Sequence, residues 1–321
     1  MRVGIDPVVW HQHAWLNRWQ SLLLLLAMVG FLALLGGLLA GAIGILILLL
    51  VGVVLVLFTP VISPQWIMYL YGAWPLSEAQ APMLYEALRQ LAQRAGLTVV
   101  PTLYYLPSRI VNAFTAGYGE RALLAVSDGL LRSLDGREQI AVLAHEISHI
   151  RANDMWVMGL ADVFSRLTSL CSLFGQILLV INLPLLLMSE VTINWFAIFV
   201  LIFAPGLSAL AQLGLSRMRE YDADLNAVRL TGDPQGLARA LIKIERVQDA
   251  WFERLFLPGR RLPEPSLLRT HPATEERVAR LLELQPQDEP VWGDQAAPFA
   301  DTVYDRDIRR APRWHIGGLW H

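Results

Sequence analysis

The helix-forming stretch 140–150 reads Ile140-Ala-Val-Leu-Ala-His-Glu-Ile-Ser-His-Ile150 and decides both the fold and the chemistry. Its apolar residues recur at helical spacing, so they form one stripe that faces a core. His145 and His149 lie on roughly the opposite side, about 40° apart around the helix, so both imidazoles can reach one ion. Glu146 adjoins them, where a carboxylate can take a proton from a zinc-bound water. We interpret the pattern as one turn of a zinc-hydrolase site.

A catalytic zinc site needs a third protein ligand from elsewhere in the chain. The segment Ser216-Arg-Met-Arg-Glu-Tyr-Asp-Ala-Asp224 supplies three acids. Glu220 and Asp224 share one helical face at i and i+4, whereas Asp222 is rotated by about 200° from Glu220. We assign Glu220 as the ligand and Asp224 as the acceptor that orients a ligand histidine. A solvated acidic helix, with the neighbouring arginines as ion-pair partners, is the alternative.

The composition indicates a membrane protein, because 55% of the 321 residues are hydrophobic and only 17% are charged. Residues 21–58 carry no charge and are about twice as long as one crossing requires. We expect a helical hairpin there, with its turn between Gly36 and Gly44; one long tilted helix is the alternative. A second apolar pair, at about 170–188 and 195–215, brings the expected number of crossings to four.

Charge placement predicts the orientation. The short connectors inside both hairpins hold no Lys or Arg, so both ends of the chain and the catalytic segment are expected in the cytoplasm, in a multi-pass protein of the plasma membrane, the inner membrane of a bacterium. Aromatic residues that follow the second crossing, Trp66 and Tyr69 among them, suit the membrane interface. A net charge of -2 gives no indication of nucleic-acid binding. A single cysteine excludes an intramolecular disulfide and a thiolate zinc cluster.

Further motifs follow in order between about residues 63 and 284. They are Tyr71-Gly-Ala-Trp-Pro-Leu, Asn112-Ala-Phe-Thr-Ala-Gly117, Ser127-Asp-Gly-Leu-Leu131, His145-Glu-Ile-Ser-His-Ile-Arg-Ala-Asn-Asp154, Arg219-Glu-Tyr-Asp-Ala-Asp224 and His271-Pro272. Together with the intervening apolar pair, they resemble the HtpX-type membrane zinc metallopeptidases, which are gluzincins related to the CAAX prenyl endopeptidases. The resemblance implies that His145, His149 and Glu220 bind one Zn²⁺ per chain and that Glu146 is the catalytic base. It also implies protein or peptide substrates, membrane proteins among them, and a role in quality control.

The same resemblance implies roles for two other segments. His271 is a candidate donor to the oxyanion, and a structural histidine at a helix start is the alternative. Asn112, Ala113 and Phe114 begin an extended segment that ends in a turn, and they would form a sheet edge where a peptide adds as a strand. The order Thr115-Ala116 and the stretch after Asp224 depart from the family pattern, but neither change touches a ligand. The C-terminal extension has no counterpart in the family, so the resemblance implies no role for it.

We therefore expect a mainly α membrane protein of the α+β class, with four transmembrane helices and a cytoplasmic helical metallopeptidase domain that carries a small β-sheet. Soluble helices are expected at 77–100, with a cap near Ser77, and at 235–256 and 273–284. The expected segments are 1–20 (N-terminal cytoplasmic), 21–58 (first hairpin), 59–169 (first part of the catalytic domain), 170–215 (second hairpin), 216–284 (second part, with the third ligand) and 285–321 (a tail containing Pro and Trp).

Two other functions stay open at this point. A CAAX-type prenyl-protein endopeptidase would need more crossings, enclosing a large chamber, than the four expected here. A catalytically silent zinc-binding membrane scaffold would have no use for Glu146, which is intact. The sequence predicts no particular oligomeric state.

Overall fold

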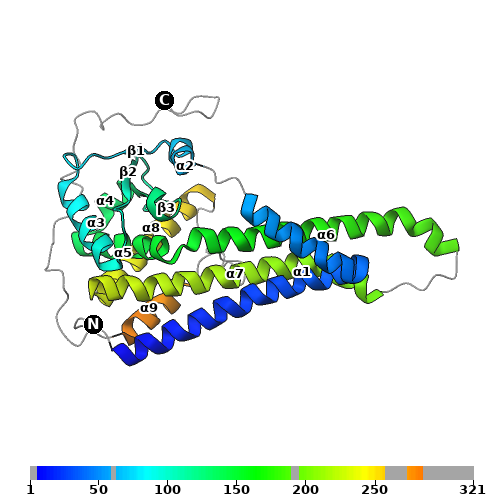
Figure 1. The fold of residues 1–321 in the computed structure, drawn as a ribbon. Coiled ribbons are helices and arrows are strands. Elements are labelled where there is room, and N and C mark those ends of the chain that lie inside the picture. The colour runs from blue at the N-terminus through cyan, green and yellow to red at the C-terminus, as the bar shows by residue number, and fades with distance from the viewer. Residues whose placement is uncertain (1–5, 59–62, 189–194, 257–272, 285–321) are drawn as a thin grey trace.

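The computed structural model describes residues 6–58, 63–188, 195–256 and 273–284. It is mainly helical, with one small mixed sheet (Figure 1). The helices are α1 (Pro7–Phe58), α2 (Pro64–Leu70), α3 (Pro82–Ala95), α4 (Asp128–Ser133), α5 (Gly136–Ala152), α6 (Asp154–Met188), α7 (Trp195–Thr231), α8 (Pro234–Phe256) and α9 (Thr274–Glu283), with a 3-10 turn at Gly119–Arg121. The strands are β1 (Trp74–Pro75), β2 (Thr102–Leu106), β3 (Ala113–Ala116) and β4 (Leu123–Ser127).

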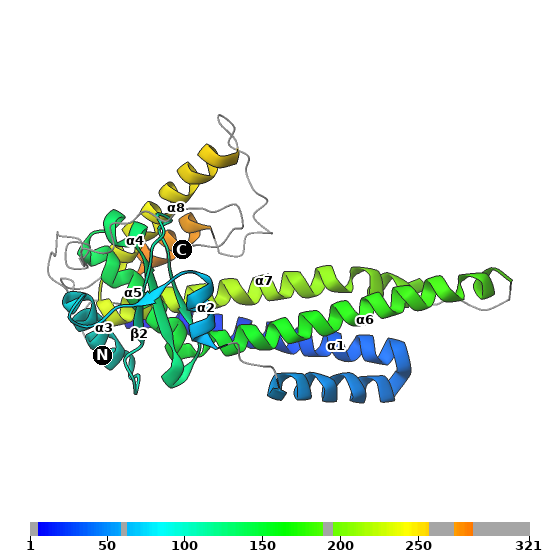
Figure 2. The same ribbon diagram turned by 90° about the horizontal axis from the view of Figure 1, so that it is seen from above.

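Three helices among the described residues, α1, α6 and α7, are long and apolar enough to cross a membrane. They lie side by side in both views and extend away from the domain that holds the sheet (Figures 1 and 2). Many of their large apolar side chains are exposed, including Leu46, Val180 and Phe199. Exposed apolar surface on this scale is unfavourable in water, so a lipid bilayer surrounds this part of the molecule.

The first of these helices reverses direction, as expected for residues 21–58. Ala40 and Gly41 leave the helical region of backbone space, and Gly41 has a φ of 62°. Figure 2 shows the second arm of α1 running back along the first. The backbones of Gly36 and Gly44 touch so closely that a Cβ built on Gly44 would lie 2.1 Å from the Gly36 carbonyl oxygen. The alternative of one long tilted helix is therefore wrong.

The sheet has the order β1-β2-β4-β3, in which β2 and β4 are parallel and the other two pairs are antiparallel. The predicted extended segment after Asn112 is strand β3, and it occupies an edge of the sheet. Gly117 follows with a φ of 81°, a left-handed conformation that glycine adopts at no steric cost and that ends the strand in a turn.

Helix α5 runs through the middle of the soluble domain and packs against β3, α3, α7 and α8. Asp135 begins it with a capping box: the Glu138 N–H donates to the Asp135 side chain, and the Asp135 N–H donates to the Glu138 side chain. The predicted apolar stripe is fully buried, from Ile140 through Leu143 to Ile147. This burial fixes the rotation of α5 and therefore the direction in which its two histidines point.

One predicted boundary is wrong. Helix α3 begins at Pro82, not near Ser77, because residues 77–81 form a separate turn in which Ala81 N–H donates to the Ser77 carbonyl at 3.2 Å. Proline suits the first turn of a helix, where its missing N–H has no partner to lose. The helix ends as expected at Gly96, and the predictions of helices at 235–256 and 273–284 are confirmed by α8 and α9.

Gly44→Ala is expected to destabilise the α1 hairpin by about 1–3 kcal/mol, because the new methyl group must push the two arms apart. The measurement is the thermal midpoint of the detergent-solubilised protein. Gly30→Ala is the matched control in the same helix, since nothing lies within 4 Å of a Cβ at that position. Equal midpoints for the two variants would contradict the close approach.

Candidate metal centre

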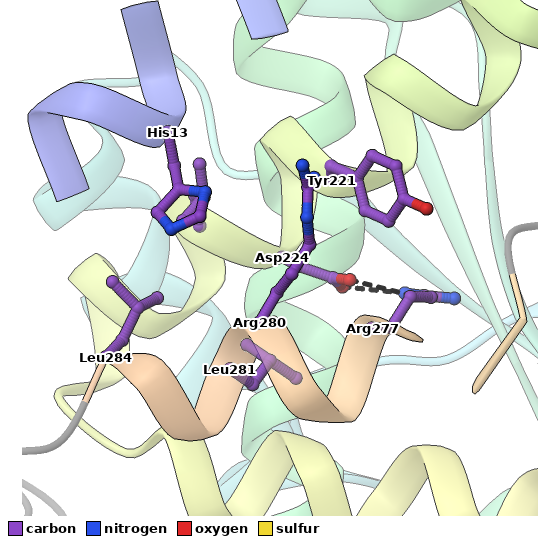
Figure 3. Close-up of a pocket in the computed structure, with 8 residues that line it drawn as sticks. His13, Tyr221, Asp224, Arg277, Arg280, Leu281 and Leu284 are labelled. Carbon is purple, nitrogen blue, oxygen red and sulfur yellow. Dashed lines mark hydrogen bonds and ion pairs between the residues drawn. The ribbon is translucent and has the colours of Figure 1, made fainter. Parts of the chain in front are cut away.

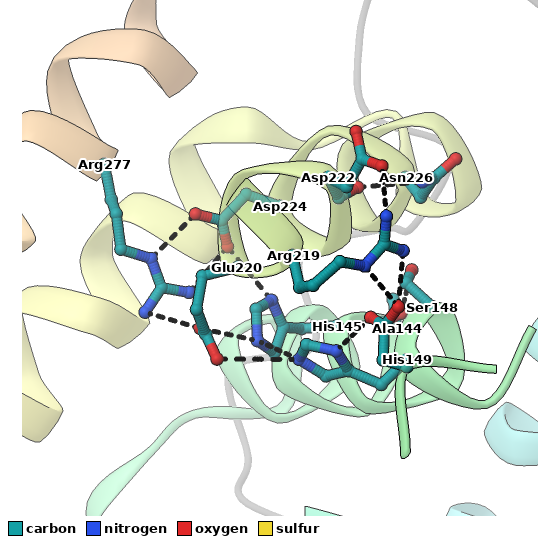
Figure 4. Close-up of polar contacts among 11 residues, drawn as sticks. Ala144, His145, Ser148, His149, Arg219, Glu220, Asp222, Asp224, Asn226 and Arg277 are labelled. Carbon is teal, nitrogen blue, oxygen red and sulfur yellow. Dashed lines mark hydrogen bonds and ion pairs between the residues drawn. The ribbon is translucent and has the colours of Figure 1, made fainter. Parts of the chain in front are cut away.

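The centre forms where α5 meets α7. His145 and His149 come from one turn of α5, and Glu220 comes from α7 (Figure 4). The two imidazole Nε2 atoms are 3.1 Å apart. The Glu220 carboxylate lies 3.5 Å from Nε2 of His145 and 3.9 Å from Nε2 of His149. One ligand atom from each of the three residues lies within 4.8 Å of the others, so the set could hold a metal ion.

Each histidine is backed by a carboxylate on its other ring nitrogen. Nδ1 of His149 lies 2.7 Å from Oδ2 of Asp154, and Nδ1 of His145 lies 3.0 Å from Oδ1 of Asp224. The second contact is an ion pair and does not have hydrogen-bond geometry. A carboxylate in this position favours the tautomer that carries the hydrogen on Nδ1 and leaves the Nε2 lone pair for a metal.

The donor set fits a metal ion on its own chemistry. With Nδ1 protonated on both rings, two Nε2 lone pairs and a carboxylate face one point with no hydrogen to share between them. Such a convergence of electron pairs is unfavourable unless a cation or a proton neutralises it. Nitrogen and oxygen donors in this combination are those of zinc sites.

The centre is shielded from water. His145 is 8% exposed, and Glu146 and Glu220 are each 9% exposed. Burial disfavours the charged form of His145, but Asp224 and Glu220 outweigh that effect and raise its pKa to about 10. The environment therefore stabilises positive charge at the position where the three donor groups converge.

The alternative of a solvated acidic helix at 216–224 is wrong. Glu220, Asp222 and Asp224 are all buried, and each has a defined partner. Asp222 points away from the histidines, as its position on the helix predicts, and accepts a hydrogen bond from Arg219 at 2.9 Å. The three buried acids therefore serve two separate purposes: Glu220 and Asp224 lie at the histidines, and Asp222 pairs with Arg219.

Two residues of the centre were missed in the sequence. Asp154 lies at the end of the quoted histidine motif, and Asn153, with a φ of 54°, ends α5 and turns the chain so that Asp154 reaches His149. Arg277 comes from α9; its guanidinium donates to both oxygens of Asp224, at 2.7 and 2.6 Å, and lies 3.3 Å from Glu220. An available signal was its spacing, because Arg277 shares the apolar face of α9 with Leu281 and Leu284.

The remaining predicted residues are placed as follows. Asn112 precedes strand β3, which contains Ala113 and Phe114, and α5 packs against this strand. His271 and the tail at 285–321 lie outside the described residues. Glu146 follows His145 on α5, and the negative charge of Glu146 helps to stabilise the Arg277 guanidinium.

A small pocket lies on the other side of Asp224, between α1, α7 and α9 (Figure 3). His13, Tyr221 and Leu281 are among the side chains that line it, but His145, His149 and Glu220 are not. This pocket is therefore separate from the point where the three candidate ligands converge.

A helix-borne pair of histidines, a buried acid from a membrane-length helix and an apolar helical bundle define the class of membrane metallopeptidases. Comparison with known families agrees: residues 78–285 match the model of Peptidase family M48, and the chain belongs to this family of metalloendopeptidases.

Relatives of known name cover most of the chain. It is 32% identical over 285 residues to the Protease HtpX homolog of Paraburkholderia phytofirmans and 32% identical over 287 residues to that of Burkholderia mallei. Each match covers 83% of this chain and 96% of the relative. The crystal structure of S. mikatae Ste24p superposes with a TM-score of 0.45 at 22% identity, covering 87% of this chain and 67% of that one.

Glu220→Gln is expected to reduce metal retention, because it removes the charged donor while keeping the shape of the side chain. Metal content after dialysis, measured by elemental analysis, should fall from roughly one ion per chain to well under half of that value. Glu78→Gln is the matched control, since Glu78 is exposed and pairs only with Arg89 in the described structure. Unchanged metal content in Glu220→Gln would rule out this residue as a ligand.

Proposed function

We propose that this metallopeptidase is a zinc-dependent endopeptidase of the membrane that hydrolyses peptide bonds of misfolded or membrane proteins in quality control. The observation that supports it most is the convergence of His145, His149 and Glu220 on one point, with a carboxylate behind each histidine. The relatives that carry the name Protease HtpX homolog support the same proposal.

In the proposed mechanism, His145, His149 and Glu220 would hold one Zn²⁺, and Asp224 would orient His145 through its Nδ1. When bound, the ion supplies polarisation of the scissile carbonyl and a lowered pKa for the attacking water. Glu146 accepts the proton of that water and passes it to the departing amine, so it acts first as base and then as acid. The low exposure of the site keeps bulk water away from the charged groups.

The substrate backbone is proposed to add to the sheet at β3. Among the residues that the structure describes, this strand pairs with β4 alone, so its other edge has main-chain groups available for a peptide. Asn112, Ala113 and Phe114 would form this part of the site. The main chain of Asn112 already exchanges hydrogen bonds with Ser127, so Asn112 would contribute through its side chain. Because main-chain pairing reads little of the side chains, such a site suits an enzyme of broad specificity.

His271 remains our proposed donor to the oxyanion. It lies six positions before Arg277 in the sequence, and Arg277 of α9 contacts Asp224 and Glu220. A histidine donor there would stabilise negative charge that develops on the carbonyl oxygen.

For the membrane arrangement, we propose four crossings: the two arms of α1 at 21–58 and the pair at 170–215. The parts of the catalytic domain at 59–169 and 216–284 would then lie together in the cytoplasm, beside a bacterial inner membrane. The absence of Lys and Arg from 36–44 and 189–194 supports this orientation. Exposed Trp66 and Tyr69 on α2, just after α1, suit the interface on that side.

Glu146→Gln is expected to retain zinc but to lower the rate of cleavage by about 10²- to 10⁴-fold, because it removes the proton acceptor and keeps the fold. The assay uses casein or a model membrane protein with the detergent-solubilised full chain, and zinc content is measured on the same samples. Glu86→Gln, at an exposed position of α3, is the control.

Two results of this assay would contradict the proposal. Full activity of Glu146→Gln would remove the general base from the mechanism. Absence of cleavage in both the parent protein and Glu146→Gln, with zinc bound to each, would favour the catalytically silent scaffold.

Charged substitutions on the β3 edge, Asn112→Asp and Thr115→Asp, are expected to raise KM by about 3- to 10-fold, as when one or two substrate hydrogen bonds are weakened. Zinc content should not change. Thr102→Asp, at the exposed start of the inner strand β2, is the control. Kinetics identical to those of the parent protein would remove β3 from the binding site.

A further inference from the structure

A continuous chain of buried polar contacts runs from the candidate metal centre to the first membrane helix. It begins at His149, passes through Asp154, Arg219 and Asp222, and ends at Asn17 of α1. Figure 4 labels His149, Arg219 and Asp222. The four side chains beyond His149 come from α6, α7 and α1, and all are at most about one-eighth exposed. Of the five residues in this series of contacts, only His149 is a candidate ligand.

The link between Asp154 and Arg219 controls what Asp154 can do for His149. One carboxylate oxygen, Oδ2, accepts from Nδ1 of the histidine at 2.7 Å, and the other, Oδ1, accepts from the Arg219 guanidinium. Engaging both oxygens fixes the plane of the carboxylate. A fixed acceptor holds the His149 ring in one orientation, with Nε2 directed at the point where the candidate ligands converge.

Arg219 is held in turn from its other side. Its Nη1 donates to Oδ2 of Asp222 at 2.9 Å, and Oδ1 of Asp222 accepts from Nδ2 of Asn17 at 3.3 Å. Asn17 is fully buried although it is a polar residue of α1. A buried N–H group is unfavourable unless it is hydrogen-bonded, and Asp222 satisfies Nδ2 of this amide, so the contact joins α1 to α7 at the level of the centre.

We propose that Arg219 is a positioning residue for His149, acting through Asp154, and that Asn17 of α1 completes the arrangement by holding Asp222. The inference rests on the proposed zinc site, and it extends the site to the N-terminal part of the first membrane helix. Asp154, Arg219 and Asp222 touch neither substrate nor metal; they determine how well His149 is presented.

The test is the zinc affinity of the detergent-solubilised full chain, measured by competition with a chromogenic chelator. Asp154→Asn and Arg219→Gln should each weaken zinc binding by about 10- to 100-fold, the usual effect of losing an outer partner of a ligand histidine. Asn17→Ala should weaken it by about 2- to 10-fold, the effect of one hydrogen bond further away. The double variant Asp154→Asn/Arg219→Gln should be no weaker than Asp154→Asn, because both changes act on one path.

A matched control separates positioning from folding. Arg137, in the first turn of α5 and eight residues before His145, makes a similarly buried pair with Asp233 at 2.7 and 2.9 Å. Arg137→Gln should lower the thermal midpoint and leave zinc affinity within about twofold of the parent protein, as expected for a remote site.

The positioning role would be overturned if Arg219→Gln bound zinc as tightly as Arg137→Gln does. It would also be overturned if the effects of Asp154→Asn and Arg219→Gln were strictly additive in the double variant. Parental affinity in Asn17→Ala would remove α1 from the arrangement. Failure of the parent protein itself to bind zinc would overturn the proposed function and not this inference alone.

Discussion

The structure depends on the burial of ionisable groups at the contact between α5 and α7. An uncompensated buried charge costs several kcal/mol, so imidazoles and carboxylates can be placed in such a contact only if each has a partner. The described residues meet this condition in pairs: Asp154 faces His149, Asp224 faces His145, and Arg277 lies against both Asp224 and Glu220. The apolar stripe of α5 makes the arrangement possible, because its burial turns the histidines toward α7.

The long helices connect this centre to the membrane. Helix α7 continues without a break from its apolar half into the segment that carries Glu220, and α6 begins at Asp154, directly behind His149. Helix α1 donates two side-chain hydrogen bonds to α7 among the described residues: Trp10 Nε1 donates to the Leu225 carbonyl at 3.1 Å, and Asn17 donates to Asp222. The candidate ligands are therefore built on the same rigid elements that pass along the bundle.

Much of this could be predicted from sequence because the signals are local. The histidine spacing, the apolar stripe of α5, the uncharged stretch at 21–58 and the extended segment after Asn112 each follow from helix or strand periodicity. Glu220 lies more than 70 residues from His149, so local spacing alone could not connect the two. Its helical face suggested it as a ligand, and the resemblance to HtpX-type metallopeptidases, which the family match confirms, supported that assignment.

The rest depends on contacts between distant segments, which periodicity does not encode. The sequence pattern of α9 does not predict that Arg277 pairs with Asp224, and that of α1 does not predict that Asn17 pairs with Asp222. Asp154 was hidden for a different reason, because the left-handed Asn153 ends the helix and changes the direction of the next side chain. The start of α3 shifted to Pro82 since a local turn at 77–81 competed successfully with the helix.

The most direct test of the account is X-ray absorption at the zinc edge on the purified full chain loaded with one equivalent of Zn²⁺. The account predicts a first shell of nitrogen and oxygen atoms at about 2.0–2.2 Å with outer scattering from two imidazole rings. Loss of one imidazole contribution in His149→Ala would agree with it. A shell that contains sulfur, or one without imidazole scattering, would contradict the claim that α5 and α7 together build the metal centre.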